Sequence, residues 1–258
     1  MRYGLIGEKL GHSHSKFIHE RMVAQEYEMI PLNQDEFDKF MMEKNFTGIN
    51  VTIPYKEKVI PYLDDIDSLA KKIGAVNTIV NSHGKLKGYN TDFYGLLYLF
   101  KRNEIDVKSK KCLVLGDGGT SKTAQAVLEE LGAKEILVIS RNPQGDNRIS
   151  YKEAYDNHYD ANIIVNTTPL GMYPNIDASP LDLNPFTLCS ALVDVIFNPL
   201  ETKLSLQAKS LGIKAVTGLA MLVAQAKQAE EYFRNIILDD SVIDDVSQEL
   251  LKRISPTN

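Results

Sequence analysis

A strand, a glycine-rich turn and a helix in direct succession constrain the fold more than any other feature of this chain. The apolar residues 112–115 run into a turn that contains Gly116, Gly118 and Gly119, and an alanine- and leucine-bearing stretch follows at 121–131. This order directs backbone N–H groups and the positive end of a helix dipole at one point, where a pyrophosphate can bind. The stretch therefore predicts a dinucleotide-binding unit. A tight turn that needs glycine only for its backbone, and binds nothing, is the alternative.

The end of the next predicted strand bears on which dinucleotide would bind. Residues 136–139 of the predicted strand 135–139 are apolar, and Ser140 and Arg141 follow them. An NAD site usually has a carboxylate near this point, which accepts hydrogen bonds from the ribose hydroxyls, whereas a guanidinium suits the additional phosphate of NADP. A surface arginine after a strand is also common without any nucleotide, so Arg141 favours NADP only in combination with the glycine turn.

Composition and charge exclude several classes of protein. The 258 residues are 43% hydrophobic and 24% charged, which fits one large or two small globular domains. The net charge of −5 argues against nucleic acid or an anionic membrane as the main partner, and the two cysteines form neither a metal cluster nor a disulfide framework. Because no signal peptide or membrane span is recognisable, we expect a cytoplasmic protein. We also expect no metal, since no metal-type cluster of cysteines is present.

Apolar periodicity divides the chain into two parts that differ in character. The first part has predicted strands at 3–6, 48–52, 76–81 and 85–89, helices at 16–26, 35–44, 67–73 and 91–102, and a helix expected to begin near Pro54. The second part has near-continuous apolar strands at 112–115, 135–139, 163–166, 192–195 and 213–216, followed by helices at 218–236 and 241–253. Such strands are typical of a parallel sheet that is covered on both faces.

Six further motifs occur in order along the chain. They are Gly11-His12-Ser13-His14-Ser15, Asn50-Val51-Thr52-Ile53-Pro54-Tyr55-Lys56, Gly74-Ala75-Val76-Asn77-Thr78, Gly88-Tyr89-Asn90-Thr91-Asp92, Asn166-Thr167-Thr168-Pro169-Leu170-Gly171-Met172 and Gly218-Leu219-Ala220-Met221-Leu222-Val223-Ala224-Gln225-Ala226. With the glycine turn, this ordered set closely resembles the shikimate dehydrogenase family over nearly the whole chain. The resemblance implies an NADP-dependent oxidoreductase that reversibly reduces 3-dehydroshikimate to shikimate, in the pathway to chorismate and the aromatic amino acids.

The resemblance and the strand pattern together predict an α/β protein of two domains. The N-terminal substrate-binding domain would comprise residues 1–101 and 237–258, because the last helix is expected to pack back on it. Residues 102–236 would form a Rossmann-type, doubly wound parallel sheet that binds the dinucleotide. We expect the substrate site in the cleft between the domains, and a monomer or homodimer.

Lys56 and Asp92 match the catalytic lysine and its partner carboxylate in the family. Hydride reduction of a ketone produces a developing alkoxide, so a proton donor must lie beside it, and an ammonium both stabilises that charge and supplies a proton. Asp92 would hold Lys56 and accept a hydrogen bond from a substrate hydroxyl. Taken without the resemblance, Lys56 could be a solvated helix residue and Asp92 an N-cap. Their contact cannot be derived from sequence.

The remaining site residues also follow from the resemblance. Ser13 and Ser15 would donate to the substrate carboxylate, although serines at this place can instead cap the following helix. The ring hydroxyls would be bound by Thr52, Asn77, Asn90 and Gln225. The two asparagines could equally be turn residues, and a lone glutamine on an alanine-rich helix is more often exposed. The residues implied for the cofactor are Gly116, Gly118, Gly119, Ser140, Arg141, Thr167, Met172, Gly218 and Met221, with Arg148 as a further positive contact.

Three departures from the family pattern leave alternatives open. Asp117 replaces a small residue in the glycine turn, Ser140 replaces an asparagine, and Phe197 stands where many members have a tyrosine that reaches the substrate. A carboxylate beside a pyrophosphate is unfavourable unless it points away. The alternatives are an NAD-dependent quinate/shikimate dehydrogenase and a ligand-sensing relative without turnover. An intact Lys56–Asp92 pair argues against the latter, since a sensor needs no proton donor.

Overall fold

The computed structural model describes residues 2–11 and 13–254, and the chain divides into two compact units. Unit 1 is Met1–Gly95 with Val223–Asn258, and unit 2 is Leu96–Leu222. Both boundaries fall inside helices, α4 (Thr91–Arg102) and α8 (Leu219–Arg234). The sequence placed them later, at 101/102 and 236/237, because apolar periodicity continues through each helix and gives no signal where its contacts change from one unit to the other.

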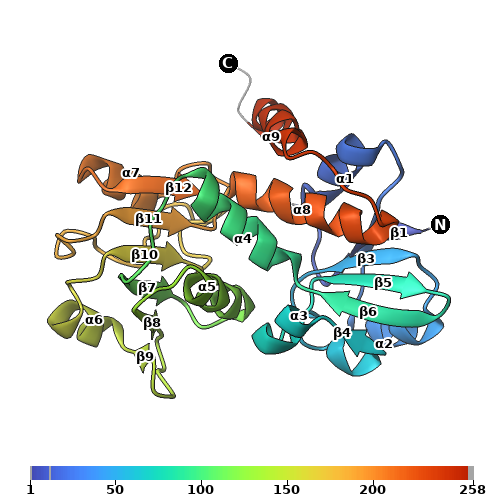
Figure 1. Cartoon of the computed structure of the whole chain (residues 1–258), viewed down its shortest axis with the longest axis horizontal. Helices are drawn as coiled ribbons and strands as arrows, with labels where there is room; N and C mark the ends of the chain where they lie inside the picture. Colours follow the sequence, from blue (N-terminus) through green and yellow to red (C-terminus); the bar gives the residue numbers. More distant parts are fainter. Residues whose placement is uncertain (1, 12, 255–258) are drawn as a thin grey trace. The chain divides into compact units, whose positions relative to one another are not determined.

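Unit 1 contains a mixed sheet of six strands in the order β2-β1-β3-β5-β6-β4 (Figure 1). The strands are β1 (Tyr3–Gly7), β2 (Glu28–Pro31), β3 (Gly48–Val51), β4 (Asp65–Ile66), β5 (Thr78–Ser82) and β6 (Lys85–Tyr89). β1 pairs in parallel with β2 and β3, while β5 is antiparallel to both β3 and β6. The short strands β2 and β4 were not predicted, since neither has the length to show a period of two.

The helices of unit 1 are α1 (Ser15–Val23), α2 (Gln34–Glu43), α3 (Ser68–Ile73), α9 (Ser241–Ile254) and the parts of α4 and α8 named above, with one 3₁₀ turn, η1 (Ile60–Tyr62). α9 lies beside α1 (Figure 1), and Arg21 of α1 donates from Nε to Glu249 of α9 at 2.6 Å. The last helix thus packs on the N-terminal part of the chain.

The prediction of a helix beginning near Pro54 is wrong. Residues 53–59 form turns, and only η1 follows them. Tyr55 explains the difference, because its ring is buried and stacks on Phe37 at 4.2 Å, and its hydroxyl donates to the carbonyl of Leu32 at 2.7 Å. These tertiary contacts hold the segment against α2, and a proline that suits a first helical turn carries no information about them.

Unit 2 contains a six-stranded sheet in which every pairing is parallel. Its strands are β7 (Lys111–Leu115), β8 (Glu135–Ile139), β9 (Arg148–Ile149), β10 (Ile163–Asn166), β11 (Ala191–Asp194) and β12 (Lys214–Thr217), in the order β12-β11-β10-β7-β8-β9. Numbered within the unit, this order is the 3-2-1-4-5-6 of dinucleotide-binding folds. The helices α5 (Gly119–Glu130), α6 (Tyr151–Asn157) and α7 (Lys203–Ser210) connect the strands.

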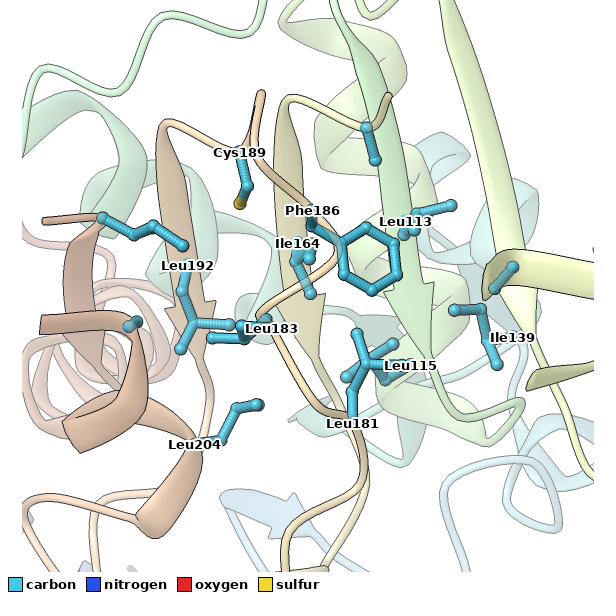
Figure 2. Close-up of a cluster of buried hydrophobic side chains, with 14 of the residues drawn as sticks. Leu113, Leu115, Ile139, Ile164, Leu181, Leu183, Phe186, Cys189, Leu192 and Leu204 are labelled. Atoms are coloured by element: carbon cyan, nitrogen blue, oxygen red, sulfur yellow. The ribbon is translucent and has the colours of Figure 1, made fainter. Parts of the chain in front are cut away.

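The core of unit 2 shows why its strands read as continuous apolar runs. Leu113 and Leu115 of β7, two residues apart, project from one face of the sheet together with Ile164 and Leu192 (Figure 2). Phe186 covers them from the long connection between β10 and β11, and is 1% exposed. Alternate residues of the same strands, such as Val114, are buried on the other face. Both faces of the sheet are therefore buried, as the apolar runs indicated.

None of the helices in residues 2–11 and 13–254 is long and apolar enough to cross a membrane.

Candidate active site

Lys56 and Asp92 form an ion pair within unit 1. Nζ of Lys56 lies 2.5 Å from Oδ2 of Asp92, and the two side chains are 22% and 14% exposed. Backbone pairing brings them together across 36 residues, because the carbonyl of Lys56 accepts from the N–H of Val76 at 2.8 Å, just before β5. The hairpin of β5 and β6 then leads into α4, whose first turn carries Asp92. Both groups remain within reach of a ligand.

Asn77 lies at the start of this hairpin and is almost fully buried, with 3% exposed. Its carboxamide oxygen accepts three hydrogen bonds, from the backbone N–H of Thr91 at 2.7 Å and from the hydroxyls of Thr91 and Thr78 at 3.2 and 3.1 Å. The acceptor is thereby fully used, and the NH₂ group is left to donate to a ligand. Thr91 adjoins Asp92, so these bonds tie the amide to the turn that carries the carboxylate.

Buried hydrogen bonds extend this network to the sheet and to α8. Asn50 donates to the hydroxyl of Thr78 at 3.0 Å and accepts from the hydroxyl of Tyr27 at 2.7 Å. The hydroxyl of Thr91, whose single proton is shared with Asn77, also lies 3.4 Å from Oε1 of Gln225. Gln225 is half-buried, so the alternative of a solvent-exposed glutamine is wrong. A connected buried network of this kind fixes side-chain orientation, because each member costs free energy if it turns away from its partner.

The structure gives Asn90 a local role. Its oxygen accepts from the N–H of Phe93 at 3.2 Å, which caps α4, and its nitrogen donates to the carbonyl of Ala75 at 3.0 Å. This is the use of asparagine as a turn residue. It also shows that Asp92 is not the N-cap of α4, because the cap lies two residues earlier.

Ser13, Ser15 and Thr52 lie in loops or at an element end. The hydroxyl of Ser13 donates to that of Ser15 at 3.0 Å and accepts from the N–H of Ser15 at 3.2 Å. The N-cap of α1 is His14, which makes no side-chain cap bond, so neither serine is the N-cap of the helix. Thr52 follows β3 and donates its backbone N–H to the carbonyl of Ile6 at 2.9 Å.

The glycine turn of unit 2 leaves the start of α5 open. Gly116 has φ +97°, a conformation that favours glycine, and its N–H donates to the carbonyl of Ile139 at 2.9 Å. Gly118 is the N-cap of α5 and provides no side-chain cap. A Cβ atom built on Gly118 or Gly119 would meet nothing within 4 Å. The space beside the first turn of α5 is thus open, and the unpaired N–H groups of a helix start favour an anion such as a pyrophosphate there.

Thr167 and Met172 belong to the connection that follows β10. Thr167 donates its backbone N–H and its hydroxyl to the carbonyl of Leu115, at 3.0 and 2.6 Å, which places it directly beside the glycine turn. A Cβ atom on Gly116 would lie 3.2 Å from the hydroxyl of Thr167, so a side chain there would crowd Thr167. Met172 is 43% exposed.

Gly218 and Met221 lie where β12 leads into α8. A Cβ atom on Gly218 would lie 2.0 Å from the carbonyl oxygen of Val195, so no side chain fits there. Met221 is 8% exposed and thus has little surface to offer a ligand in this conformation. Ser140 and Arg141 follow a different strand, β8, and Arg141 is exposed.

Sequence reasoning missed a buried carboxylate that holds one of these loops. Asp194 ends β11 fully buried and accepts from Asn166 at 3.0 Å, from the N–H of Ile196 at 3.1 Å and from the hydroxyl of Thr202 at 2.6 Å. Burial raises the pKa of Asp194, although its hydrogen bonds oppose the shift. Asn166 in turn accepts from the N–H of Thr168. An aspartate at the end of an apolar strand was the available signal.

In the described residues, no group of three or more His, Cys, Asp or Glu side chains is arranged to hold a metal ion.

Comparison with known proteins assigns the chain to a family. A sequence profile described as the shikimate dehydrogenase substrate binding domain matches residues 5–79. A protein of Clostridium beijerinckii named shikimate dehydrogenase (NADP(+)) is 39% identical over 254 residues, covering 93% of this chain and 94% of that protein. The chain belongs to the shikimate dehydrogenase family.

Solved structures of this family agree with the fold. A chorismate mutase/shikimate 5-dehydrogenase fusion protein from Clostridium acetobutylicum gives a TM-score of 0.91 at 38% identity, over 98% of this chain and 97% of that one. Shikimate 5-dehydrogenase from Thermus thermophilus, solved with NADP(H) and shikimate, gives 0.87 at 30% identity, over 96% of this chain and 99% of that one. The predicted α/β class with a Rossmann-type parallel sheet is confirmed.

Proposed function

We propose that this member of the family is an NADP-dependent shikimate dehydrogenase, which interconverts 3-dehydroshikimate and shikimate on the route to chorismate and the aromatic amino acids. Relatives matched over more than 90% of the chain are named shikimate dehydrogenase (NADP(+)), and a relative of known structure binds NADP(H) and shikimate. The observation that carries the proposal at the level of chemistry is the Lys56–Asp92 pair at 2.5 Å, because this reaction needs a proton donor beside a carbonyl.

Lys56 has the central role in the proposed mechanism. In the direction of reduction its ammonium lies beside the substrate carbonyl oxygen, stabilises the negative charge that develops there and donates a proton to it. In the direction of oxidation the neutral amine takes the proton from the hydroxyl. Asp92 holds the amine through the 2.5 Å contact and accepts a hydrogen bond from a neighbouring substrate hydroxyl. NADP, when bound, supplies the nicotinamide that exchanges a hydride with C3 of the ring.

Asn77 and Gln225 orient the ring in this proposal. The oxygen of Asn77 is held by three protein donors, so its NH₂ group is directed to donate to a ring hydroxyl. Ser13 and Ser15, already in contact with each other at 3.0 Å, would turn both hydroxyls to the substrate carboxylate. Thr52 adds a hydroxyl. Asn90, which also caps α4, would bind a ring hydroxyl through the second N–H of its amide.

The cofactor would be held by unit 2. The N–H groups at the start of α5 would bind the pyrophosphate in the open space beside Gly118 and Gly119. Arg141, exposed after β8, would bind the additional phosphate of NADP, with Ser140 beside it. Thr167, Met172, Gly218 and Met221 would border the ribose and the nicotinamide.

A matrix of initial rates tests this function. Shikimate and quinate are each offered with NADP and with NAD, and reduction is followed at 340 nm. We expect the highest kcat/KM with shikimate and NADP. A preference for NAD with quinate would favour the quinate/shikimate dehydrogenase, while binding of shikimate without absorbance change in any combination would favour the ligand sensor. A cytoplasmic location and a monomeric or homodimeric state belong to the same proposal.

A further inference from the structure

An ion pair that the family pattern does not predict crosses the glycine turn of unit 2. Arg148 donates from Nε to Oδ2 of Asp117 at 2.9 Å. The side chains are 25% and 29% exposed, so the pair can open to solvent without unfolding of the unit. Asp117 is the residue that replaces a small one in the turn, and this contact shows where its carboxylate points.

The pair crosses the carboxyl end of β8, from the end of β7 to the start of β9. Asp117 follows β7, and the N–H of the preceding Gly116 bonds to the carbonyl of Ile139 at the end of β8. Arg148 opens β9 and lies opposite Val138 of β8 in the sheet register. In a sheet of this strand order, the ribose that follows the pyrophosphate lies above the end of the second strand, and its 2′ substituent is bound there. The Asp117–Arg148 pair therefore lies at the place where NADP and NAD differ.

Arg148 is the anchored member of the pair. Its NH1 group donates to Oδ1 of Asn147 at 2.9 Å, and Asn147 donates to Gln125 of α5 at 3.0 Å. Gly145, with φ +104°, lies beside the guanidinium, since a Cβ atom there would be in ordinary van der Waals contact with NH1 at 3.7 Å. Asp117 has a short side chain in the turn and is 29% exposed, so it is the group that would move when another anion approaches.

We propose that Asp117 is a specificity-determining residue, which competes with the 2′-phosphate of NADP for Arg148 and so narrows the preference for NADP over NAD. This inference rests on the proposed function, since it concerns the cofactor of that reaction. The 2′-phosphate must displace the carboxylate from Arg148 before the guanidinium can bind it. NAD carries an uncharged hydroxyl at this position, so its binding does not require that displacement.

Binding of two adenosine nucleotides to the purified protein tests the inference without turnover. The probes are 2′,5′-ADP, which carries the 2′-phosphate, and 5′-AMP, which lacks it, and both are titrated by calorimetry. Asp117→Asn should lower the Kd of 2′,5′-ADP about two- to fivefold, the range expected when a partly exposed charge pair is removed. The Kd of 5′-AMP should stay within about 1.5-fold of the parent value.

Two further variants isolate the mechanism. Asp146→Asn is the charge-matched control, because it removes one negative charge from an exposed residue two positions before Arg148. It should leave both Kd values unchanged. In an Arg148→Ala background, Asp117→Asn should lose its effect on 2′,5′-ADP, because the competition needs the guanidinium. Circular dichroism and thermal unfolding of each variant establish that it is folded.

The inference is overturned if Asp117→Asn changes both nucleotides equally, leaves 2′,5′-ADP unchanged or weakens it, or keeps its effect without Arg148. If the parent protein binds no 2′,5′-ADP but binds 5′-AMP, the NADP assignment itself fails, and the inference fails with it. Steady-state kinetics provide a second measurement, in which Asp117→Asn should lower the KM for NADP while that for NAD stays unchanged.

Discussion

Lys56→Ala separates a catalytic role of the lysine from a structural one. The substitution removes the only proton donor that the proposed mechanism places at the reacting oxygen. Loss of a positioned donor lowers kcat about 10²- to 10⁴-fold, which corresponds to roughly 3–5 kcal/mol of activation free energy. Binding of shikimate should be largely retained, because Asn77 and Asp92 remain.

The structure predicts only a small loss of stability for Lys56→Ala. The pair is partly exposed, at 22% and 14%, so its removal should cost about 1 kcal/mol of unfolding free energy. For a chain of this size that corresponds to a fall in Tm of about 2–4 °C. A variant that is folded at the assay temperature but has lost at least 99% of its kcat cannot owe that loss to unfolding.

The assay is NADP reduction at 340 nm with saturating shikimate, combined with calorimetric titration of shikimate and thermal unfolding. Lys58→Ala is the matched control, because Lys58 lies two residues further on, bonds to Gln34 and approaches the ring of Tyr55 at 5.7 Å. It should keep kcat within about twofold. If Lys56→Ala retains kcat within a few-fold of the parent, or if both variants lose activity alike, the assignment of Lys56 as proton donor is refuted.

The other predictions concern the cofactor and the stability of the two units. Arg141→Ala should raise the KM for NADP far more than that for NAD, because the cofactors differ at the 2′-phosphate; an equal rise would remove Arg141 from the phosphate site. Asp194→Ala leaves three buried donors without an acceptor and should cost about 3 kcal/mol, a fall in Tm of about 6–12 °C, whereas an unchanged Tm would contradict the network. Burial raises the pKa of Glu230, but hydrogen bonds and charges from His19 and Arg234 outweigh burial and hold that pKa below its usual 4.5. The stability that results is present above about pH 4.5 and is lost as the pH falls through the lowered pKa. In urea unfolding between pH 3 and 7, the free energy of unfolding should therefore fall less toward acid pH for Glu230→Gln than for the parent. An equal fall in both proteins would show that the ionised Glu230 adds no stability.

The parallel sheet of unit 2 could be predicted because its signals are local. Five of its strands are apolar runs between turns, and the glycines mark the β7–α5 turn by their backbone requirement. β9 is two residues long and carries no such signal. The helix expected near Pro54 fails for a related reason: the stacking of Tyr55 on Phe37 joins residues 18 apart in the chain, and propensity contains no information about it.

The candidate site was predictable as a set of residues but not as an arrangement. Ordered motifs identified Lys56, Asp92 and Asn77 through resemblance. The roles of Asn90 as a cap and of Asp194 as a buried loop anchor became visible only from their hydrogen bonds. The contact between Asp117 and Arg148 was equally hidden, since the two residues lie 31 positions apart and each was identified separately.

The amino-acid order by itself determined the class of fold, the position of the phosphate-binding turn and the family, because periodicity, glycine placement and motif order are properties of neighbouring residues. Only the tertiary structure decided which charges meet. The amine of Lys56 reaches the carboxylate of Asp92 because Val76 pairs with the backbone of Lys56 and the β5–β6 hairpin returns the chain to α4. Such contacts depend on distances through space, which strand pairing sets and which separation along the chain does not encode.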